Sequence, residues 1–463
     1  MGTSKFKDVI QNVFKNYSSL LVPAVIGLFA VLLFIPTQLM SGKLKKQIMN
    51  ESITKRGKEI QSLRNSAVAR DQHIEERKYQ DDYKNDADEM ALLAKQSAQR
   101  QLLSYKIFPE PKDMSAFIFE DFGQQFREAV RGLLARVNAR DCPTDIELER
   151  GLEGLSKGHS RVDRRSDRLI GRGVSGSRLT EAKATIEDVL CREKAESASV
   201  YANPTDLSGY EFWKEYEATS WADTIKDCWY WQLGYWIIED VVDAVDALNT
   251  GSNSVFTSPV KRLLGVSFAT GGKTSRSKAG GKAADDKPKY VLSIEDVLIR
   301  PCTGRFSEGD IDVVHFNVVV VVSAKAILPF MQQLCSAKEH KFRGWDGEAQ
   351  EQLFKHNQIT ILESEIKSID REDSTHRLYR YGDDAVVELD LICEYIFDRA
   401  GYDKIKPEFV KESVKEVLKK LEEEKAKAGR RQSRTKTETK TETKTETKTK
   451  SGKKSRRELP ELP

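Results

Sequence analysis

The chain has 463 residues, of which 39% are hydrophobic and 32% are charged, and its formal net charge is +3. This composition is too polar for a typical compact enzyme and predicts exposed helices and tails around a modest core. Residues 429–463 carry twelve Lys and Arg against five Asp and Glu, so the rest of the chain has a net charge of −4, which excludes a basic nucleic-acid-binding domain.

Residues 20–40 read LLVPAVIGLFAVLLFIPTQLM and contain no charged residue. At about 1.5 Å per residue, a helix of this length would span the ~30 Å hydrocarbon core of a bilayer. The run is longer than the ~7–15 apolar residues of a cleavable signal, and no small-residue cleavage site follows it. The sequence therefore predicts an uncleaved transmembrane helix at 20–40 after a short N-terminus at 1–19.

The orientation of this segment is left open by its flanking charges. Basic residues are more numerous in 43–58 than before residue 20, which would keep the long C-terminal part in the cytoplasm. Long domains can nevertheless cross a membrane regardless of flanking charge.

Residues 41–105 are polar and rich in helix-forming residues, and they predict a long helix. A partial heptad pattern is formed by Leu44, Ile48, Ile60 and Leu63, but it does not continue after residue 68. A coiled coil is compatible with this pattern but is not required by it.

Residues 106–205 predict a helical region with an arginine-rich insertion. SAFIFEDFGQQFREAVRGLLARVNA has an apolar stripe at helical spacing, which is typical of a core-facing helix. HSRVDRRSDRLIGRGVSGSRLT contains six arginines and is interpreted as a surface insertion, with an anion-binding patch as the alternative. GRGVSG in this stretch follows no predicted strand, so it is not interpreted as a phosphate-binding loop.

Five of the six tryptophans lie between residues 212 and 249, most of them in one predicted helix. Buried tryptophans are typical both of cores and of partner surfaces. We predict that Trp229 and Trp236 contact a partner. The carboxylates of Glu239, Asp243 and Asp246 share the opposite face, where a solvated helix surface explains them better than a metal or acid–base site.

The strands of the predicted domain at 206–400 follow this helix. IDVVHFNVVVVVS predicts a central strand whose valines alternate with His315 and Asn317, and His315 is interpreted as a hydrogen-bonded core residue. QITILESEIKSID predicts a strand with a bulge, and AVVELDLICEYIF predicts one whose Glu388, Asp390 and Glu394 face water.

The C-terminal part predicts an exposed helix at 401–428 and a disordered basic tail at 429–463. The repeat TKTETKTETKTETKTK contains no apolar residue to bury. It is a solubilising tail or a site for an anionic membrane or polymer.

No catalytic, cofactor-binding or metal-binding residues are predicted, and the protein is not expected to be an enzyme. The six cysteines lack the C-x-x-C spacing of zinc sites, and nucleophile-elbow, Walker and H-E-x-x-H motifs are absent. The redox state of the cysteines is left open.

From Trp221 to Phe397 the predicted order is helix, strand, strand, helix, strand, strand, which is a ferredoxin-like αββ–αββ arrangement in an α+β fold. With a membrane helix and a polar helix before it, the chain resembles the PilO family of inner-membrane assembly proteins of type IV pili, similar in design to GspM of type II secretion. SPVKRLLGVSF and CTGRFSEGDIDVVHFNVVVVVSAKAILPFMQQL carry this resemblance. The arginine-rich insertion, the loop at 269–289 and the tail depart from a minimal member.

The resemblance implies a single-pass protein of the bacterial inner membrane, anchored by residues 20–40, with a cytoplasmic N-terminus and a periplasmic body. It implies a scaffold subunit of a pilus or secretion platform that forms a homodimer or pairs with a related subunit. Neither a small-molecule substrate nor nucleic acid is expected. The alternative is an anchored protein that binds an anionic polymer through the arginine-rich loop and the basic tail.

Overall fold

The structure is a computed structural model that describes residues 18–51, 56–65, 70–113, 115–151, 153, 176–217, 220–269, 286–300 and 303–446. The chain divides into two compact units, Met1–Asp88 and Glu89–Pro463. Helix α4 crosses the division.

The first unit contains α2 (Ser18–Ile48), α3 (Arg56–Asn65) and the first part of α4 (Arg70–Ser97). Every side chain that the structure describes in this unit is exposed. Helices α3 and α4 are rich in Lys, Glu, Gln and Arg, whose local preference favours a helix without a buried seam.

The prediction of a transmembrane helix at 20–40 is contradicted. Among the residues that the structure describes, no helix is both long enough and apolar enough to cross a membrane. The side chains of 20–22, 24–25, 33 and 35–39 lie outside the described ones, and α2 continues past the apolar run to Lys45 and Lys46 in its last turn. The single-pass inner-membrane location was inferred from this segment and is contradicted by the same finding.

The second unit is built on a six-stranded sheet in the order β1-β2-β3-β4-β8-β7. The pairs β1–β2 and β2–β3 are parallel, and the other pairs are antiparallel. Its strands are β1 (Ala139–Arg140), β2 (Val200–Tyr201), β3 (Val260–Ser267), β4 (Ile311–Ser323), β7 (Ile359–Ser368) and β8 (Val386–Asp398). A separate hairpin pairs β5 (Lys338–Phe342) with β6 (Gln352–His356).

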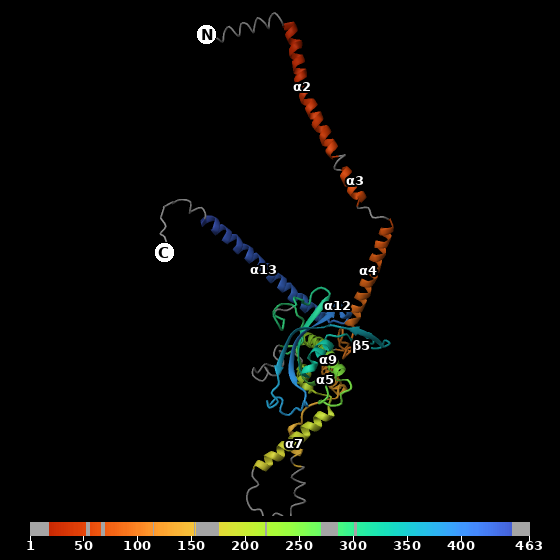
Figure 1. Cartoon of the computed structure of the whole chain (residues 1–463), viewed down its shortest axis with the longest axis vertical. Helices are drawn as coiled ribbons and strands as arrows, with labels where there is room; N and C mark the ends of the chain where they lie inside the picture. The colour runs from red at the N-terminus through yellow and green to blue at the C-terminus, as the bar shows by residue number, and fades with distance from the viewer. Residues whose placement is uncertain are drawn as a thin grey trace, which may run out of the picture. The chain divides into compact units, whose positions relative to one another are not determined.

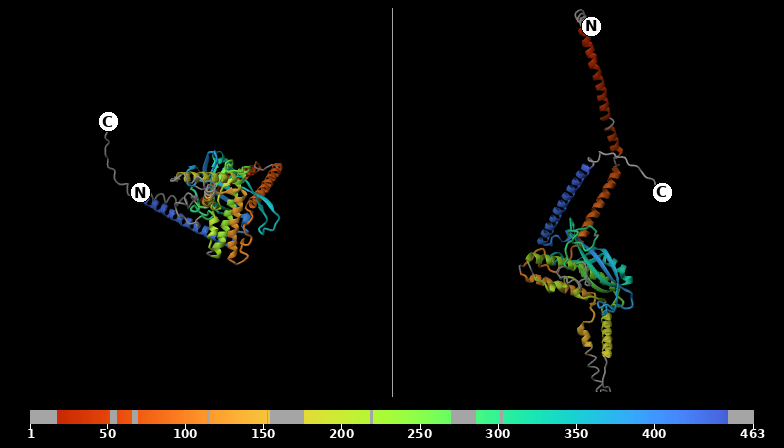
Figure 2. Two further views of the ribbon diagram at one scale, coloured as in Figure 1. Left: turned by 90° about the horizontal axis from the view of Figure 1, so that it is seen from below. Right: turned by 90° about the vertical axis from the view of Figure 1, so that its left-hand side faces the viewer.

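Helices form a layer beside this sheet. Figure 2, right, shows α9 and α5, in yellow-green and orange-yellow, next to the blue-green strands, and Figure 1 labels both. After α4, the helices of the second unit include α5 (Phe117–Arg136), α7 (Gly176–Ser197), α8 (Tyr210–Lys214), α9 (Trp221–Asn249), α11 (Ile327–Leu334), α12 (Arg399–Tyr402) and α13 (Glu408–Glu446). Helices α7 and α13 extend away from the sheet (Figures 1 and 2). Short 3₁₀ turns lie at η2 (Pro204–Asp206) and η4 (Ala324–Ala326).

The predicted fold class needs correction. The elements from Trp221 to Asp398 follow the order α9-β3-β4-α11-β7-β8, with the hairpin β5–β6 inserted before β7. Two further strands, β1 and β2, extend the sheet and make it mixed rather than antiparallel. The described fold is thus a mixed α/β sheet with a helical layer, and a membrane-anchored ferredoxin-like domain does not describe it.

Strand β4 is the centre of the sheet. It pairs with β3 and β8, and its residues from Asp312 to Ser323 are all buried. The helix-facing side chains are the predicted ones and join the main core: Val314, Phe316, Val318, Val320 and Val322. On the other face, Val321 packs in a second cluster with Tyr201 and Tyr381. Its nearly continuous run of valines suits a strand covered on both faces.

Helix α9 is buried on nearly all sides. Ser220 caps its first turn by accepting a hydrogen bond from the backbone N–H of Asp223, which satisfies one of the free donors at a helix start. The predicted solvated face is wrong, because Glu239 and Asp243 are half-buried and pair with Arg100 and Arg136.

The C-terminal helix is longer than predicted. α13 runs from Glu408 to Glu446 and so enters the stretch at 429–463 for which disorder was predicted. Helix propagation from an established turn costs little per residue, because each added residue gains a hydrogen bond. Residues 447–463 lie outside the described part of the chain.

Candidate functional site

A group of buried charges surrounds Arg100, which follows the end of α4. Its Nη2 lies 2.6 Å from Glu239 Oε2 and 2.8 Å from Asp240 Oδ1, both on α9. Its Nη1 donates a hydrogen bond of 2.8 Å to the hydroxyl of Tyr395 on β8. Because Arg100 is only 2% exposed, these contacts join α9 to β8 inside the unit.

Two histidines of the hairpin β5–β6 extend this group. His356 Nε2 lies 2.8 Å from Asp240 Oδ2, and His356 Nδ1 lies 2.8 Å from His340 Nδ1. His340 Nε2 lies 2.9 Å from the carbonyl oxygen of Gln99. Burial lowers the pKa of His340 to about 3, so this ring is neutral near pH 7. Burial also lowers the pKa of His356.

This Arg100 group has the residue types of a proton relay, but its position favours a structural role. Burial alone would raise the pKa of Asp240, but Arg100 and His356 hold it below its usual range, so the carboxylate is charged. A general acid or base must reach its substrate. Arg100, Asp240 and His356 are all buried, and none lines the pocket described below.

A second buried group surrounds Asp312 on β4. Arg399 Nη2 lies 2.7 Å from its Oδ1, and Lys406 Nζ lies 2.9 Å from its Oδ2. The hydroxyl of Tyr402 donates to the same carboxylate. Burial alone would raise the pKa of Asp312. The two cations lower it by more than that, so the pKa is below its usual value. This group attaches the segment after β8 to the central strand.

The predicted water-facing side of β8 is wrong at Glu388, which is 8% exposed, and at Glu394. The carboxylate of Glu394 is fully buried. Arg305 Nε donates to it at 2.9 Å, and the hydroxyl of Thr303 donates at 3.0 Å. The loop that carries these two residues therefore covers this end of the sheet.

The two predicted partner-contact residues lie in the core. Trp229 and Trp236 are 0% and 1% exposed. Trp229 Nε1 donates to the hydroxyl of Tyr290, and Trp236 Nε1 donates to the carbonyl oxygen of Gln101, each at 2.9 Å. Their role in partner contact stays a prediction, and their position gives it no support.

His315 is a hydrogen-bonded core residue, as predicted. It is 4% exposed, and its Nδ1 accepts a hydrogen bond of 3.2 Å from the backbone N–H of Leu298. Burial lowers its pKa.

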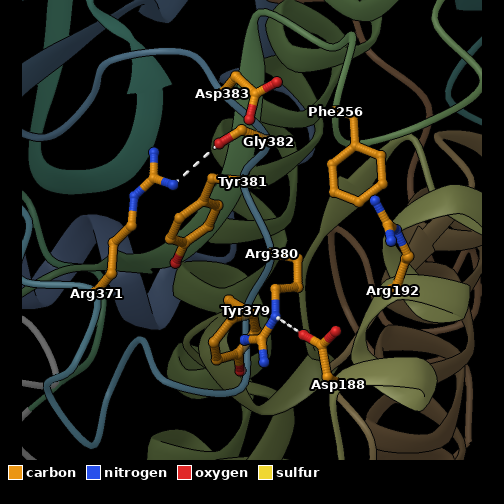
Figure 3. Close-up of a pocket in the computed structure, with 9 residues that line it drawn as sticks. All are labelled: Asp188, Arg192, Phe256, Arg371, Tyr379, Arg380, Tyr381, Gly382 and Asp383. Atoms are coloured by element: carbon orange, nitrogen blue, oxygen red, sulfur yellow. Dashed lines mark hydrogen bonds and ion pairs between the residues drawn. The ribbon is translucent and has the colours of Figure 1, made fainter. Parts of the chain in front are cut away.

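An open pocket of about 410 Å³ lies between α7 and the loop before β8 (Figure 3). Three arginines line it, and all three have partners within the protein. Arg192 Nε lies 3.6 Å from Glu196 Oε1. Arg380 Nε donates to Asp188 Oδ1 at 3.0 Å. Arg371 donates to the carbonyl oxygens of Gly382 at 3.0 Å and Asp384 at 2.9 Å. The remaining lining residues are Phe256, Tyr379, Tyr381 and Asp383. The charges of this pocket are nearly balanced and indicate no particular ligand.

The outer edge of β7 is the longer of the two edges of the sheet, since β7 has 10 residues and the other edge strand, β1, has 2. β7 is the last strand, and within the described residues nothing pairs with its outer side. The predicted bulge is confirmed between Ile361 and Glu363. Beyond it, residues 363–366 and 368 are exposed and Lys367 is half-buried. An exposed, regular edge can pair with another strand.

Charged side chains surround this edge. Lys367 Nζ lies 3.0 Å from Glu365 Oε2, 3.3 Å from Asp390 Oδ2 and 3.9 Å from Glu388 Oε1. The nearby carboxylates outweigh the burial of the amine, and the pKa of Lys367 is raised. One lysine thus lies among three carboxylates.

In the part of the chain that the structure describes, no three His, Cys, Asp or Glu side chains form a group that could hold a metal ion. No protein family, curated protein or solved structure matches the chain. The resemblance to PilO-like proteins therefore stays a prediction, as does the expectation that the protein is not an enzyme.

Proposed function

We propose that the protein is a structural subunit of a larger assembly and that it acts by binding other proteins through the sheet of its second unit. The open outer edge of β7 carries this proposal. This edge offers a regular row of backbone donors and acceptors, and such edges are used for strand addition between chains.

Two further observations support the proposal. The buried charges around Arg100 and Asp312 are paired within the chain and hold elements together, as expected of a scaffold. Apart from the inserted hairpin β5–β6, the order α9-β3-β4-α11-β7-β8 is the one on which the resemblance to PilO-like proteins rests, and that resemblance implies an assembly role. A membrane anchor forms no part of this proposal.

The alternative, binding of an anionic polymer through the arginine-rich loop and the basic tail, stays a prediction. Residues 154–175 and 447–463 lie outside the described residues.

The test is the native size of the protein in cell extracts, measured by sedimentation with immunodetection. We expect the wild-type chain in a complex larger than the monomer. Ile366→Asp, which places a charge on the edge of β7, should release the monomer. Leu353→Asp on β6 is the matched control, because Leu353 and Ile366 are similarly exposed, at 60% and 55%. A wild-type protein that sediments as a monomer would overturn the proposal.

A further inference from the structure

We propose that the partner of the β7 edge is a second copy of this chain, paired antiparallel through β7 and centred on Ile366, so that two sheets join into one. This inference rests on the proposed function and names the partner.

A row of facing apolar side chains crosses the sheet and ends at the exposed side chain of Ile366. Leu263 on β3 faces Val320 on β4, Val320 faces Leu389 on β8, and Leu389 faces Ile366 on β7. The first three side chains are at most 2% exposed, but Ile366 is 55% exposed. A second isoleucine placed opposite would continue the row and remove apolar surface from water.

The charges beside Ile366 select the same register. With Ile366 opposite Ile366 of the second copy, Glu365 faces Lys367 of that copy, and Lys367 faces its Glu365. Opposite charges in directly facing positions stabilise an antiparallel pair, and like charges destabilise it. Moving the centre to Glu365 sets two carboxylates against each other, and moving it to Lys367 does the same with two ammonium groups.

The pairing gives Glu365 a second cationic partner. In the single chain Glu365 shares Lys367 with Asp390 and Glu388. In the pair, each Glu365 has a second lysine directly opposite. The two-fold axis of the pair passes between the two copies of Ile366. Facing residues of an antiparallel pair point to the same side of the sheet, so the two copies have the same face in common and both helical layers lie on one side.

The length of the pairing is limited by two features of β7. The bulge between Ile361 and Glu363 interrupts the regular edge at one end, and the strand ends at Ser368. The contact is therefore short. Because the two copies use the same edge, the pair is closed, and we expect a dimer whose population depends on concentration.

The first test is disulfide formation by Ile366→Cys in the purified full-length protein. Facing residues of an antiparallel pair have Cβ atoms about 4.5–5.5 Å apart, close to disulfide distance. We expect covalent dimer to form at least ten times faster than in Leu353→Cys, and not at all in the unchanged chain. Equal rates for the two variants would overturn the inference.

The second test is charge exchange, measured by sedimentation equilibrium. Lys367→Glu should shift the protein to monomer, because it sets Glu365 against a glutamate. The double variant Glu365→Lys with Lys367→Glu should restore at least half of the dimer. Circular dichroism and thermal unfolding confirm that both variants fold. A double variant as monomeric as the single one would contradict the pairing.

These results separate the inference from the proposed function. A chain that is monomeric when pure but part of a large complex in cells would refute self-pairing and leave the scaffold role standing. A chain that is monomeric in both would refute both.

Discussion

The interior around α9 and the outer edge of β7 contain the same kinds of side chain but differ in what surrounds them. Arg100 and Asp240 are 2% and 0% exposed, whereas the side chains of Lys367 and Glu365 are 39% and 62% exposed. A buried charge must keep its partner, because the cost of an unpaired charge is large in the interior. An exposed pair can exchange partners at little cost. The interior therefore fixes the fold, and the edge is free for recognition.

The largest loss of stability is expected in the interior, for Trp229→Ala combined with Trp236→Ala. Each substitution leaves a large cavity and costs roughly 3–5 kcal/mol, against a total stability of about 5–15 kcal/mol for a typical domain. We expect the second unit to lose its tertiary structure, as measured by near-UV circular dichroism. A folded double variant with impaired assembly would instead support the predicted partner contacts.

The next largest effect is expected for Arg100→Met. It leaves the buried carboxylate of Asp240 without its cation, which costs roughly 3–5 kcal/mol of unfolding free energy. Urea unfolding measures this loss. Arg343→Met is the matched control, since the side chains of Arg343 and Glu351 are 51% and 36% exposed, and removing this pair should cost less than about 1 kcal/mol. Similar losses for both variants would show that burial does not distinguish the two pairs.

Acid should weaken the interior through His340. Its pKa is lowered from 6.5 to about 3, so on acidification the unfolded chain takes up the proton first. The stability from this neutral ring is fully present above pH 6.5 and is lost as the pH falls from 6.5 towards 3. We expect a loss of about 2–3 kcal/mol by pH 4.5. Thermal unfolding of wild type and His340→Gln between pH 7 and pH 4.5 checks this, and parallel slopes would contradict it.

The smallest effect is expected for Lys367→Met in dilute, monomeric protein. The amine is partly exposed and shares its contacts among three carboxylates, so its removal should change the unfolding free energy by about 0.5 kcal/mol or less. Urea unfolding at low protein concentration gives the value. A loss above about 2 kcal/mol would show that this lysine holds the sheet itself.

Periodicity predicted the parts of the fold that depend on neighbouring residues. The alternation in IDVVHFNVVVVVS matches β4 and its two faces, and the phase slip in QITILESEIKSID matches the bulge of β7. The hairpin β5–β6 was missed, because KEHKF and QLFKH contain mostly polar residues. In β5, Lys338 and His340 point inward beside Phe342.

Contacts between distant residues could not be predicted in the same way. Arg100 and Glu239 are 139 residues apart, and nothing near either one shows that they meet. Glu394 alternates with apolar residues as an exposed glutamate would, but Arg305 covers it from another loop. The charges at Glu365 and Lys367 were visible in the sequence, but they gain a meaning only once β7 is known to be the edge strand.

The position of β4 in the sheet has a consequence for how the chain is made. β4 pairs with β8 along its full length, and roughly 75 residues must be synthesised after β4 before β8 is complete, which takes about 4–15 s on a ribosome. Throughout that time the run VVVVV has only β3 as a pairing strand, and a strand so apolar readily aggregates. We expect nascent chains stalled near residue 360 to bind chaperones strongly and chains stalled well beyond Asp398 to be released from them.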